Sequence, residues 1–572
     1  MDSKKIALVI LAILLVGAML RIWNLDGPDM ITDDALYALR AVGYFDYLGS
    51  LDTQTTPAVW FSEPQWWQKL SFHDAPPLVF LVEHVFFKLF GDSITVARLP
   101  VVLFGLLSIL GIFLLGRLIG GDSVGLMAAA LMAVLNYHIW ISRIGFLDGF
   151  LLPPIIFSIY FFIKAKDKPL NYLWWFTALA AGFLTKYTFI FLLPAFGIIA
   201  FLYRRSIFKE KWFYLGLAVF FLLLSPLIIY NIMVWKTRGH FDAALSTMVG
   251  IESIDFQILK QRHIKTELSG VWGVIRTVAS KLSLGMRVIL SFALIYFSYL
   301  TIKKRKENPN LTLIFLAILS GLLVLTLVGG SDRFNVILIP LLTIVFGIAC
   351  KFLWDRAQNY RSILIGALII SALWEMLFTV QNQLIPTPFI ENRFFYDARK
   401  PVWWGYNNLD RYVENFYADN PNRNYILFSI TPQLKEYKTK IIQSFYEDGE
   451  KPQQEHLLVF DDRLEWFATT WIVERRRLYE AQAMPTLTNL IEAIDGNYVD
   501  KFLEFGFKDV YAIILTGKNA HETILNTERI TDFLKILETN YEPVDHIKND
   551  LGETAFLVYY LPLDSRLNIF KQ

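Results

Sequence analysis

Long blocks of apolar residues alternate with short polar loops along most of this chain. Each block holds about 20 residues, the length that a helix needs to cross a hydrocarbon core of about 30 Å. We therefore predict about 11 membrane-spanning helices. They begin near Ile6, Ile94, Val124, Phe150, Tyr172, Phe189, Trp212, Leu284, Leu311, Val336 and Ile363.

One further apolar stretch, residues 76–90, is predicted to lie flat at the membrane interface. It is short, opens with Pro76 and Pro77, and contains Glu83 and Lys88, which suits an interfacial helix better than a span. With this assignment the basic loops all fall on the cytoplasmic side, as the positive-inside rule requires. The first span has no small-residue cleavage site, so we predict an uncleaved first helix and a cytoplasmic N-terminus.

The pattern changes after Val380 into alternating charged and apolar residues. Strand-like runs occur at 425–429, 456–460, 510–515 and 556–561, and helix-like stretches at 409–418, 462–481 and 486–495. We predict a transmembrane module over residues 1–390, with large external loops at about 25–93 and 235–283, and a soluble extracytoplasmic α/β domain over 391–572. The domain shows no phosphate-binding loop and no metal-ligand spacing, so acceptor recognition, partner docking and structural capping stay open as its role.

Composition agrees with a membrane protein. With 572 residues, of which 55% are hydrophobic and 16% aromatic, the chain is too apolar for one soluble domain. Its formal net charge of +2 gives no reason to expect a nucleic-acid partner. The single cysteine, Cys350, excludes an internal disulfide framework. The chain is thus predicted to be a polytopic α-helical protein surrounded by membrane lipids.

Acidic residues gather in the loops predicted to be external. Asp33 and Asp34 precede a helix-like stretch at 35–47, and Asp148 stands where one span has ended and the next begins. Helix capping explains both positions, because carboxylates are favoured by the unpaired N–H groups and the dipole of a helix start. A carboxylate at the mouth of a helix bundle can also accept the proton of an incoming hydroxyl. Both interpretations stay open on the sequence alone.

A histidine and two prolines mark the first external loop. In the tract His73-Asp74-Ala75-Pro76-Pro77, the prolines impose an extended entry and so fix the direction of the residues before them. Imidazole and carboxylate can bind a phosphate or a metal ion, and His240 from a later loop can complete such a site. We therefore keep His73, Asp74 and His240 as candidate ligands of a divalent metal ion.

Three basic residues stand at span ends on the same predicted face. Arg143 shares a short turn with Asp148, Lys186 lies between two apolar stretches, and Arg333 precedes a span. Snorkelling toward the lipid headgroups explains Lys186, and a lipid phosphate is the alternative partner. Because a guanidinium matches phosphate geometry better than an ammonium does, Arg333 is the better candidate for binding a phosphate.

Taken in order, these residues resemble the polyprenyl-phosphate-dependent glycosyltransferases of the GT-C class, in particular the protein O-mannosyltransferases and the transferases that add aminoarabinose to lipid A. The matching motifs are Asp33 to Ala38, His73 to Leu78, Phe90-Gly91 with Arg98, Leu147 to Gly149, Leu184 to Lys186, and Arg333 to Pro340. The chain departs from this family in having Asp34 where the family has Glu, and in an insertion within the His-Pro-Pro tract.

The resemblance implies a GT-C fold and an inverting transfer of a sugar from a polyprenyl-phosphate-linked donor to a hydroxyl of a protein, lipid or envelope glycan. The reaction would take place on the non-cytoplasmic face of the plasma (inner) membrane. Asp33 would activate the hydroxyl with Asp34 beside it, and Asp148 would orient acceptor or donor sugar. The donor phosphate would be bound by Lys186, Arg333, His73 and Arg143. Some relatives also bind a metal ion through a carboxylate and a histidine from separate external loops.

Two other functions are weighed against this one. Oligosaccharyltransferases also join a GT-C module to an exported domain, but they carry a Trp-Trp-Asp motif where this chain has Trp403-Trp404-Gly405. A transporter or flippase for lipid-linked sugars would also have many spans. Such proteins usually place ionisable groups at mid-membrane and show repeated halves, and the sequence displays neither feature.

Overall fold

The computed structural model describes residues 2–44, 65–256, 270–305, 307–329, 331–356, 358–390, 392, 395, 397, 401–419, 455–480, 482–504, 506–516 and 528–571. Contacts between Cα atoms divide the chain into two compact units. We call Met1–Leu25 with Gln65–Lys400 the membrane unit, and Asp26–Pro64 with Pro401–Gln572 the C-terminal unit. Unlike the predicted division near residue 390, this one also assigns the segment after the first helix to the C-terminal unit.

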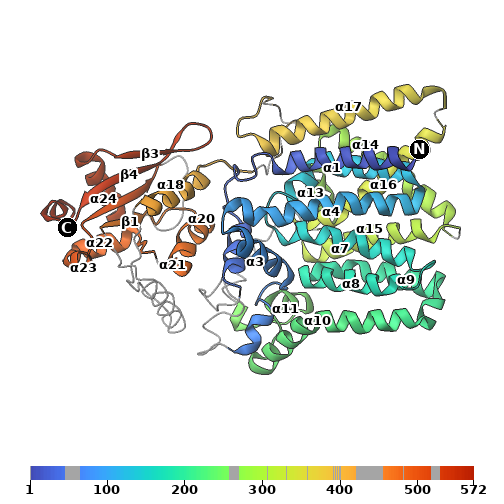
Figure 1. Ribbon diagram of the computed structural model, residues 1–572, viewed down its shortest axis with the longest axis horizontal. Helices are drawn as coiled ribbons and strands as arrows, with labels where there is room; N and C mark the ends of the chain where they lie inside the picture. Colours follow the sequence, from blue (N-terminus) through green and yellow to red (C-terminus); the bar gives the residue numbers. More distant parts are fainter. Residues whose placement is uncertain are drawn as a thin grey trace. The chain divides into compact units, whose positions relative to one another are not determined.

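The membrane unit is built from helices (Figure 1). In chain order these are α1 (Ser3–Ile22), α3 (Leu78–Phe90), α4 (Ile94–Gly120), α5 (Asp122–Val134), α6 (Asn136–Ile141), α7 (Leu147–Lys164), α8 (Asn171–Thr185), α9 (Leu192–Tyr203), α10 (Lys211–Arg238), α11 (Ala243–Val249), α13 (Gly270–Ser280), α14 (Leu284–Lys304), α15 (Pro309–Val328), α16 (Ile339–Arg356) and α17 (Arg361–Thr379). Short 3-10 helices lie between them at η2 (Trp66–Leu70), η3 (Tyr187–Phe191), η4 (Arg205–Lys209), η5 (Ile254–Phe256), η6 (Phe334–Leu338) and η7 (Gln358–Tyr360). A short π helix, η8 (Val380–Leu384), follows α17.

Among the described residues, eight helices are long and apolar enough to cross a membrane. They are α1, α4, α7, α10, α14, α15 and the segments Phe334–Arg356 and Gln358–Leu384. The other three predicted spans coincide with shorter helices, namely α5, α8 and the segment Tyr187–Tyr203. The prediction of a polytopic helical membrane protein is therefore confirmed. Hydropathy alone overestimates the length of the shorter helices, because it does not register where a helix ends inside an apolar run.

Side-chain exposure separates outer helices from central ones. On α1, Leu8, Leu15 and Met19 are 66%, 62% and 63% exposed, as expected for side chains that face lipid tails rather than other helices. On α7, by contrast, Leu151 and Ile155 are fully buried. The helix that begins at Leu147 is thus enclosed by its neighbours, which fixes the position of its first turn.

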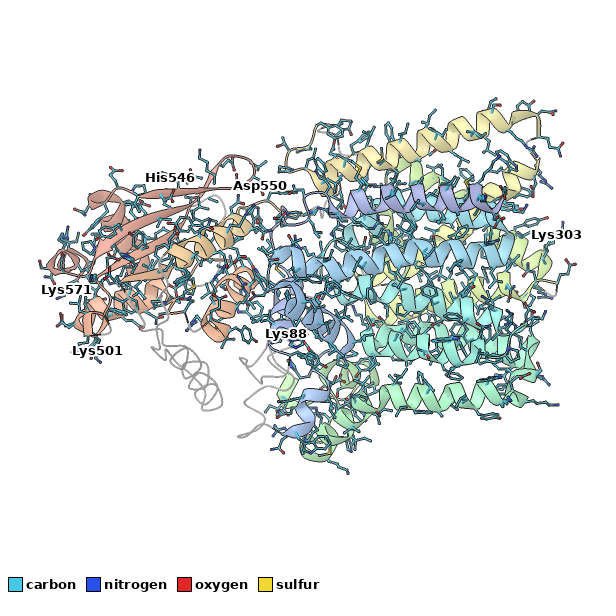
Figure 2. All side chains as sticks on the ribbon, viewed as in Figure 1. Lys88, Lys303, Lys501, His546, Asp550 and Lys571 are labelled. Atoms are coloured by element: carbon cyan, nitrogen blue, oxygen red, sulfur yellow. The ribbon has the colours of Figure 1, made fainter. Side chains whose placement is uncertain are left out.

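The two ends of the membrane unit can be followed in Figure 2. Lys303, near the end of α14, and Lys88, near the end of α3, lie at opposite ends of this unit. Helix α3 has 13 residues and is about 20 Å long at 1.5 Å per residue, too short to cross the hydrocarbon core. Its placement flat at the interface stays a prediction.

The C-terminal unit holds a four-stranded sheet of order β1-β2-β4-β3. Strands β1 (His456–Phe460) and β2 (Asp509–Leu515) are parallel, whereas β4 (Thr554–Pro562) is antiparallel to both β2 and β3 (Asp545–Lys548). The helices are α2 (Asp33–Val42), α18 (Tyr406–Asp419), α20 (Trp466–Thr469), α21 (Arg475–Tyr479), α22 (Leu487–Asp495), α23 (Val499–Glu504) and α24 (Glu528–Asn540), with η9 (Thr470–Glu474) and η10 (Ser565–Phe570).

The C-terminal sheet confirms the predicted α/β character of this region. Three predicted strands are found as β1, β2 and β4, and the fourth, 425–429, lies outside the described residues. One face of the sheet forms a core in which Leu457, Val510 and Leu561 pack with Leu490 and Phe533. The predicted helix at 462–481 is divided into α20, η9 and α21, because η9 is a wide π turn.

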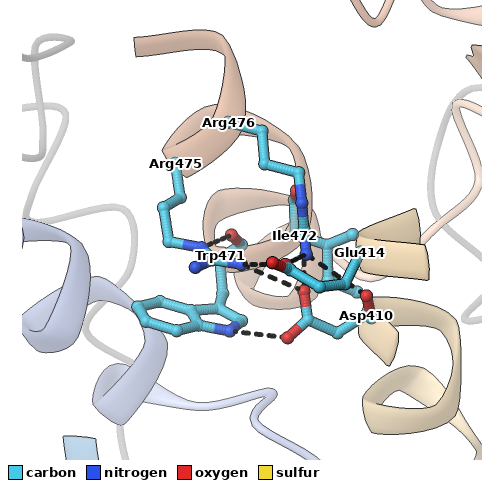
Figure 3. Close-up of polar contacts among 6 residues, drawn as sticks. All are labelled: Asp410, Glu414, Trp471, Ile472, Arg475 and Arg476. Carbon is cyan, nitrogen blue, oxygen red and sulfur yellow. Dashed lines mark hydrogen bonds and ion pairs between the residues drawn. The ribbon is translucent and has the colours of Figure 1, made fainter. Parts of the chain in front are cut away.

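A buried charge network fixes this divided helix to α18 (Figure 3). Arg476 donates hydrogen bonds of 2.6 Å to both Asp410 and Glu414. The indole N–H of Trp471 donates to Asp410 at 3.2 Å, and the Arg475 guanidinium lies 4.5 Å from the centre of the Trp471 ring. Since Arg476 is 1% exposed, its charge is stable there only with these acids as partners.

Candidate active site

The first part of the site is an ion pair between two membrane helices. Asp148 lies in the first turn of α7, and Lys186 follows the last residue of α8 in an extended conformation. The Lys186 Nζ atom lies 2.7 and 2.8 Å from the two carboxylate oxygens of Asp148. The lysine side chain is 16% exposed and the aspartate 2%. The sequence predicted both residues separately, and the structure brings them together.

Arg333 joins this pair through two aromatic rings. The Lys186 Nζ atom lies 4.0 Å from the centre of the Phe334 ring, and the Arg333 guanidinium carbon lies 5.4 Å from the same centre. The guanidinium is also 5.6 Å from the centre of the Phe146 ring. All three distances fall within the range of cation–π attraction. We call Asp148, Lys186 and Arg333 the cation cluster.

A buried aspartate ties the residue after Lys186 to a later loop. The Tyr187 hydroxyl donates to Asp242, and the Asn231 amide donates to the same oxygen at 2.9 Å. Asp242 is fully buried, and this burial raises the pKa of its carboxyl to about 6. Its other oxygen accepts the backbone N–H of Leu245 and so caps α11. The loop after α10 is therefore anchored beside the cation cluster.

His73 and His240 come from loops that meet in this region. The His73 carbonyl accepts the backbone N–H of Ala243 at 2.6 Å, and its ring lies 4.0 Å from the Asp74 carboxylate. The His240 ring is hydrogen-bonded at 2.8 Å to Asp255 and at 2.6 Å to the carbonyl of Phe241. Among the described residues, there is no group of three His, Cys, Asp or Glu side chains that could hold a metal ion. The predicted metal site at His73, Asp74 and His240 stays a prediction.

Arg143 holds the end of the first helix. Its guanidinium donates to the carbonyls of Leu20, Arg21 and Trp23 at 3.2, 2.9 and 2.7 Å, and to that of Asn24 at 2.8 Å. Carbonyls at a helix C-terminus lack intrahelical partners and attract a cation. The structure thus shows a capping role for Arg143, and its predicted contact with the donor phosphate stays a prediction.

The paired carboxylates lie in the C-terminal unit at the start of α2. Asp34 is 1% exposed and accepts hydrogen bonds from the Thr32 hydroxyl at 2.7 Å and from the Ala35 N–H at 3.1 Å. Asp33 is half-buried, and the Tyr37 hydroxyl lies 3.4 Å from one of its oxygens. We call Thr32–Ala35 the acid turn. Asp34 fixes the shape of this turn, and Asp33 is the more exposed of the two carboxylates.

Several residues of the site were not predicted from the sequence. Phe146 and Phe334 were overlooked because aromatic residues are common in an apolar chain, although both stand next to predicted residues. Asp242 follows the predicted His240 by two positions. Asn335 is fully buried, and neither atom of its side-chain amide has a hydrogen-bond partner within the described part of the chain. An amide next to Arg333 and Phe334 in a predicted span end was the available signal.

Comparison with known proteins gives this geometry a context. Residues 74–230 match the family model described as Dolichyl-phosphate-mannose-protein mannosyltransferase. ArnT from Cupriavidus metallidurans bound to undecaprenyl phosphate is 13% identical over 99% of both chains, with a TM-score of 0.55. Its apo form is 14% identical over 99% of both chains, with a TM-score of 0.54. The chain has a GT-C fold.

Other comparisons add little to this. The archaeal oligosaccharyltransferase AglB from Archaeoglobus fulgidus, in complex with an inhibitory peptide and a dolichol-phosphate, is 12% identical over 100% of this chain and 78% of its own, with a TM-score of 0.49. No curated protein sequence matches the chain. The resemblance to the mannosyltransferase and aminoarabinose transferase type is confirmed. Within this GT-C fold, Asp148 and Lys186 fall inside the segment matched by the family model, and Asp33 and Arg333 fall outside it.

Proposed function

We propose that this protein is an inverting glycosyltransferase that moves a sugar from a polyprenyl-phosphate-linked donor to an acceptor hydroxyl. The observation that carries the proposal is the cation cluster, in which Lys186 and Arg333 meet at the Phe334 ring beside the first turn of α7. Fixed cations at the end of membrane helices suit a phosphate whose lipid tail lies in the bilayer. The family model and the fold shared with undecaprenyl-phosphate-bound ArnT support the same class of donor.

In the proposed reaction Asp33 is the general base. It accepts the proton of the acceptor hydroxyl while the hydroxyl oxygen attacks the anomeric carbon of the donor sugar. The bond between this carbon and the phosphate oxygen breaks on the opposite face, and its electron pair leaves with the polyprenyl phosphate. Attack from that side inverts the anomeric configuration. Lys186 and Arg333 stabilise the negative charge on the leaving phosphate.

The other acids hold these groups in place. Asp148 binds Lys186 through both carboxylate oxygens and so fixes the direction of its ammonium. Asp34 accepts hydrogen bonds within the acid turn and so fixes the backbone that carries Asp33. Because polyprenyl phosphate leaves as an anion held by cations, the reaction needs a base more than it needs an acid.

The protein spans the membrane several times, and we place it in the plasma (inner) membrane with a cytoplasmic N-terminus. The acceptor is a hydroxyl of a protein, a lipid or an envelope glycan on the opposite face. The transferred sugar is a hexose or a pentose. A panel of donors that carry different sugars distinguishes these possibilities. Each donor that reacts releases the same polyprenyl phosphate, so one assay serves for the whole panel.

The test measures release of polyprenyl phosphate by the purified full-length protein from such a panel. We expect release by the parent and, for Asp33→Asn, a rate about 10² to 10⁴ lower with unchanged donor binding, as for the loss of a general base. Asp92→Asn, an acid of the same predicted loop, serves as the matched control and should keep the parental rate. Absence of release from every donor, with equal lipid binding by parent and variant, would contradict the proposal.

A further inference from the structure

A set of buried hydrogen bonds in the C-terminal unit joins the segment before the acid turn to the start of α18. The Asp29 carboxylate accepts the backbone N–H groups of Trp404, Gly405 and Asn407 at 2.5, 3.0 and 3.0 Å. In the main chain, the Asp29 N–H donates to the carbonyl of Val402 at 3.0 Å. One carboxylate thus organises the whole turn that opens α18.

Asn407 makes the reverse set of contacts. Its amide nitrogen donates to the carbonyls of Asp26 and Pro28 at 2.6 and 2.7 Å, and its amide oxygen accepts the N–H of Met30 at 2.9 Å. Asp29 and Asn407 are only 7% and 3% exposed. We call this reciprocal pair, Asp29 with Asn407, the clamp. It binds two stretches of chain that are 378 residues apart.

The turn that meets Asp29 depends on a glycine. Gly405 has a φ of +100°, a conformation that residues with a side chain rarely adopt. A Cβ atom there would also lie 3.0 Å from the Cβ of Ala555 and 3.2 Å from Asn549. The backbone N–H groups therefore point at Asp29 because this position carries no side chain.

The far end of α2 is also held within this unit. Gly43, which follows α2, lies against the Tyr479 phenol so closely that a Cβ atom at Gly43 would come within 1.9 Å of its oxygen. The Tyr479 hydroxyl lies 3.4 Å from the Leu39 carbonyl. The helix that begins with Asp33 is thus fixed before its first turn by the clamp and after its last turn by α21.

We propose that the clamp positions Asp33 for proton transfer, which makes Asp29 and Asn407 positioning residues of the reaction. This inference rests on the proposed role of Asp33 as the base. Asp29 precedes Asp33 by four residues. Because so little chain separates them, a shift of the clamp also moves the Asp33 carboxylate. A misplacement of about 1 Å in such a group can cost about 10² in rate, and a precise site needs support from surrounding residues.

The inference assigns a role to the C-terminal unit that its sequence did not reveal. Acceptor recognition, partner docking and capping all stayed open from the sequence. The clamp instead makes the turn at Trp404–Asn407 part of the scaffold of the acid turn. A purely structural contact would lower the stability of the unit without changing the catalytic step selectively.

The experiment compares Asn407→Ala with Asn408→Ala in the full-length protein. Asn408 is the next residue of the same helix and donates to the Lys548 carbonyl, so its variant controls for loss of an asparagine from α18. Two kinds of measurement are made: steady-state kinetics, which give kcat and KM for the polyprenyl-phosphate sugar, and amide hydrogen exchange of residues 31–42. For Asn407→Ala we expect faster exchange of this segment and a kcat lower by about 10 to 10², with KM within about twofold. Asn408→Ala should change neither.

The result that would overturn the inference is an unchanged kcat or unchanged exchange in Asn407→Ala, or an equal loss in Asn408→Ala. If Asn407→Ala does not fold, Asp29→Asn, which keeps the size of the side chain, replaces it with the same expectations. Failure of the proposed function has a different signature. In that case Asp33→Asn retains parental turnover, whatever the exchange of residues 31–42 shows.

Discussion

The cation cluster and the acid turn are held in place by different forces. Lys186 and Arg333 stand among aromatic rings at the ends of helices whose positions are set by apolar packing. The acid turn is held by hydrogen bonds that involve backbone, amide and hydroxyl groups within the C-terminal unit. Packing of long helices tolerates many substitutions of similar volume. A hydrogen-bonded clamp depends on single atoms, so the acid turn should be the more sensitive to single changes.

The contrast also concerns charge. The Lys186 side chain is 16% exposed. Arg476 is 1% exposed and divides its donors between Asp410 and Glu414 (Figure 3). An arginine of the second kind supports the fold, whereas a lysine of the first kind can exchange part of its hydrogen bonding for a phosphate.

The largest effect is expected from Arg476→Met. The change leaves Asp410, which also accepts from Trp471, without its closest cation. Removing one partner of a buried ion pair costs about 3 to 5 kcal/mol. The free energy of unfolding of the C-terminal unit should fall by that amount. Pulse proteolysis of the full-length protein in urea measures it, and the midpoint should move to a lower urea concentration. Arg566→Met, whose ion pair with Asp564 is exposed, is the control and should leave the midpoint unchanged.

The second prediction concerns pH and the clamp. Burial raises the pKa of Asp29 to about 6, although hydrogen bonds from Asn407, Trp404 and Gly405 act in the opposite direction. Burial also raises the pKa of Glu465 to about 7, with Asp34 as a further cause. An acid whose pKa is higher in the folded state keeps a proton that the unfolded chain releases. Stability from these acids is therefore greatest below pH 4 and falls as the pH rises toward 6 for Asp29 and 7 for Glu465.

Asp29→Asn isolates this effect from the other carboxylates of the unit. A rise of the pKa from 3.8 to about 6 corresponds to about 3 kcal/mol, at 1.36 kcal/mol for each pH unit. The opening free energy of residues 31–42, measured by hydrogen exchange between pH 4 and 7, should fall more steeply in the parent than in the variant. Parallel curves would show that Asp29 does not titrate in this range.

The sequence could predict the cation cluster far better than the clamp. Asp148, Lys186 and Arg333 stand at the ends of apolar runs, so hydropathy fixes their depth and parity brings them to one face. Their grouping around Phe334 could not be predicted, because several helices determine which loop ends are neighbours. The clamp gave no signal at all, since Asp29 and Asn407 are ordinary polar residues separated by 378 positions.

The elements of the C-terminal unit show the same limit. Strands β1, β2 and β4 contain apolar runs and were predicted, whereas β3, with the sequence Asp-His-Ile-Lys, has one buried residue and was missed. The predicted single helix at 462–481 ignored the π turn at η9, which forms where Arg475 and Arg476 reach Asp410. Contacts with residues distant in the sequence therefore determine these elements, which the local pattern could not predict.

A third prediction separates ligand binding from pairing at Lys186. Lys186→Met should weaken donor binding by about 10- to 150-fold, equal to the 1.5 to 3 kcal/mol of a hydrogen bond to a charged group. This variant also leaves the Asp148 carboxylate, which is 2% exposed, without the lysine. The double variant Lys186→Met/Asp148→Asn removes that problem. If the lysine binds the donor phosphate, affinity stays low in the double variant.

Recovery of parental affinity in the double variant would show that Lys186 only neutralises Asp148. Lys303→Met provides the control for loss of a lysine elsewhere in the membrane unit. Lys303 lies near the end of α14, at the opposite end of this unit from Lys88 (Figure 2). Its donor affinity should equal that of the parent. Donor affinity is measured by thermal stabilisation of the detergent-solubilised protein over a series of polyprenyl-phosphate sugar concentrations.

The smallest effect compares two buried asparagines of the membrane unit. Asn231 exchanges hydrogen bonds of 2.9 Å with Asp242, so Asn231→Leu should lower the melting temperature. Asn335 is fully buried, and within the described residues its amide has no hydrogen-bond partner. Replacing an unsatisfied amide with an apolar group of similar size removes a cost of about 1 to 3 kcal/mol. Asn335→Leu should therefore raise the melting temperature of the ligand-free protein. A lower melting temperature would show that an ordered water or a bound group satisfies this amide beside Arg333. Asn335 would then be a further residue that distinguishes the cation cluster from the clamped acid turn.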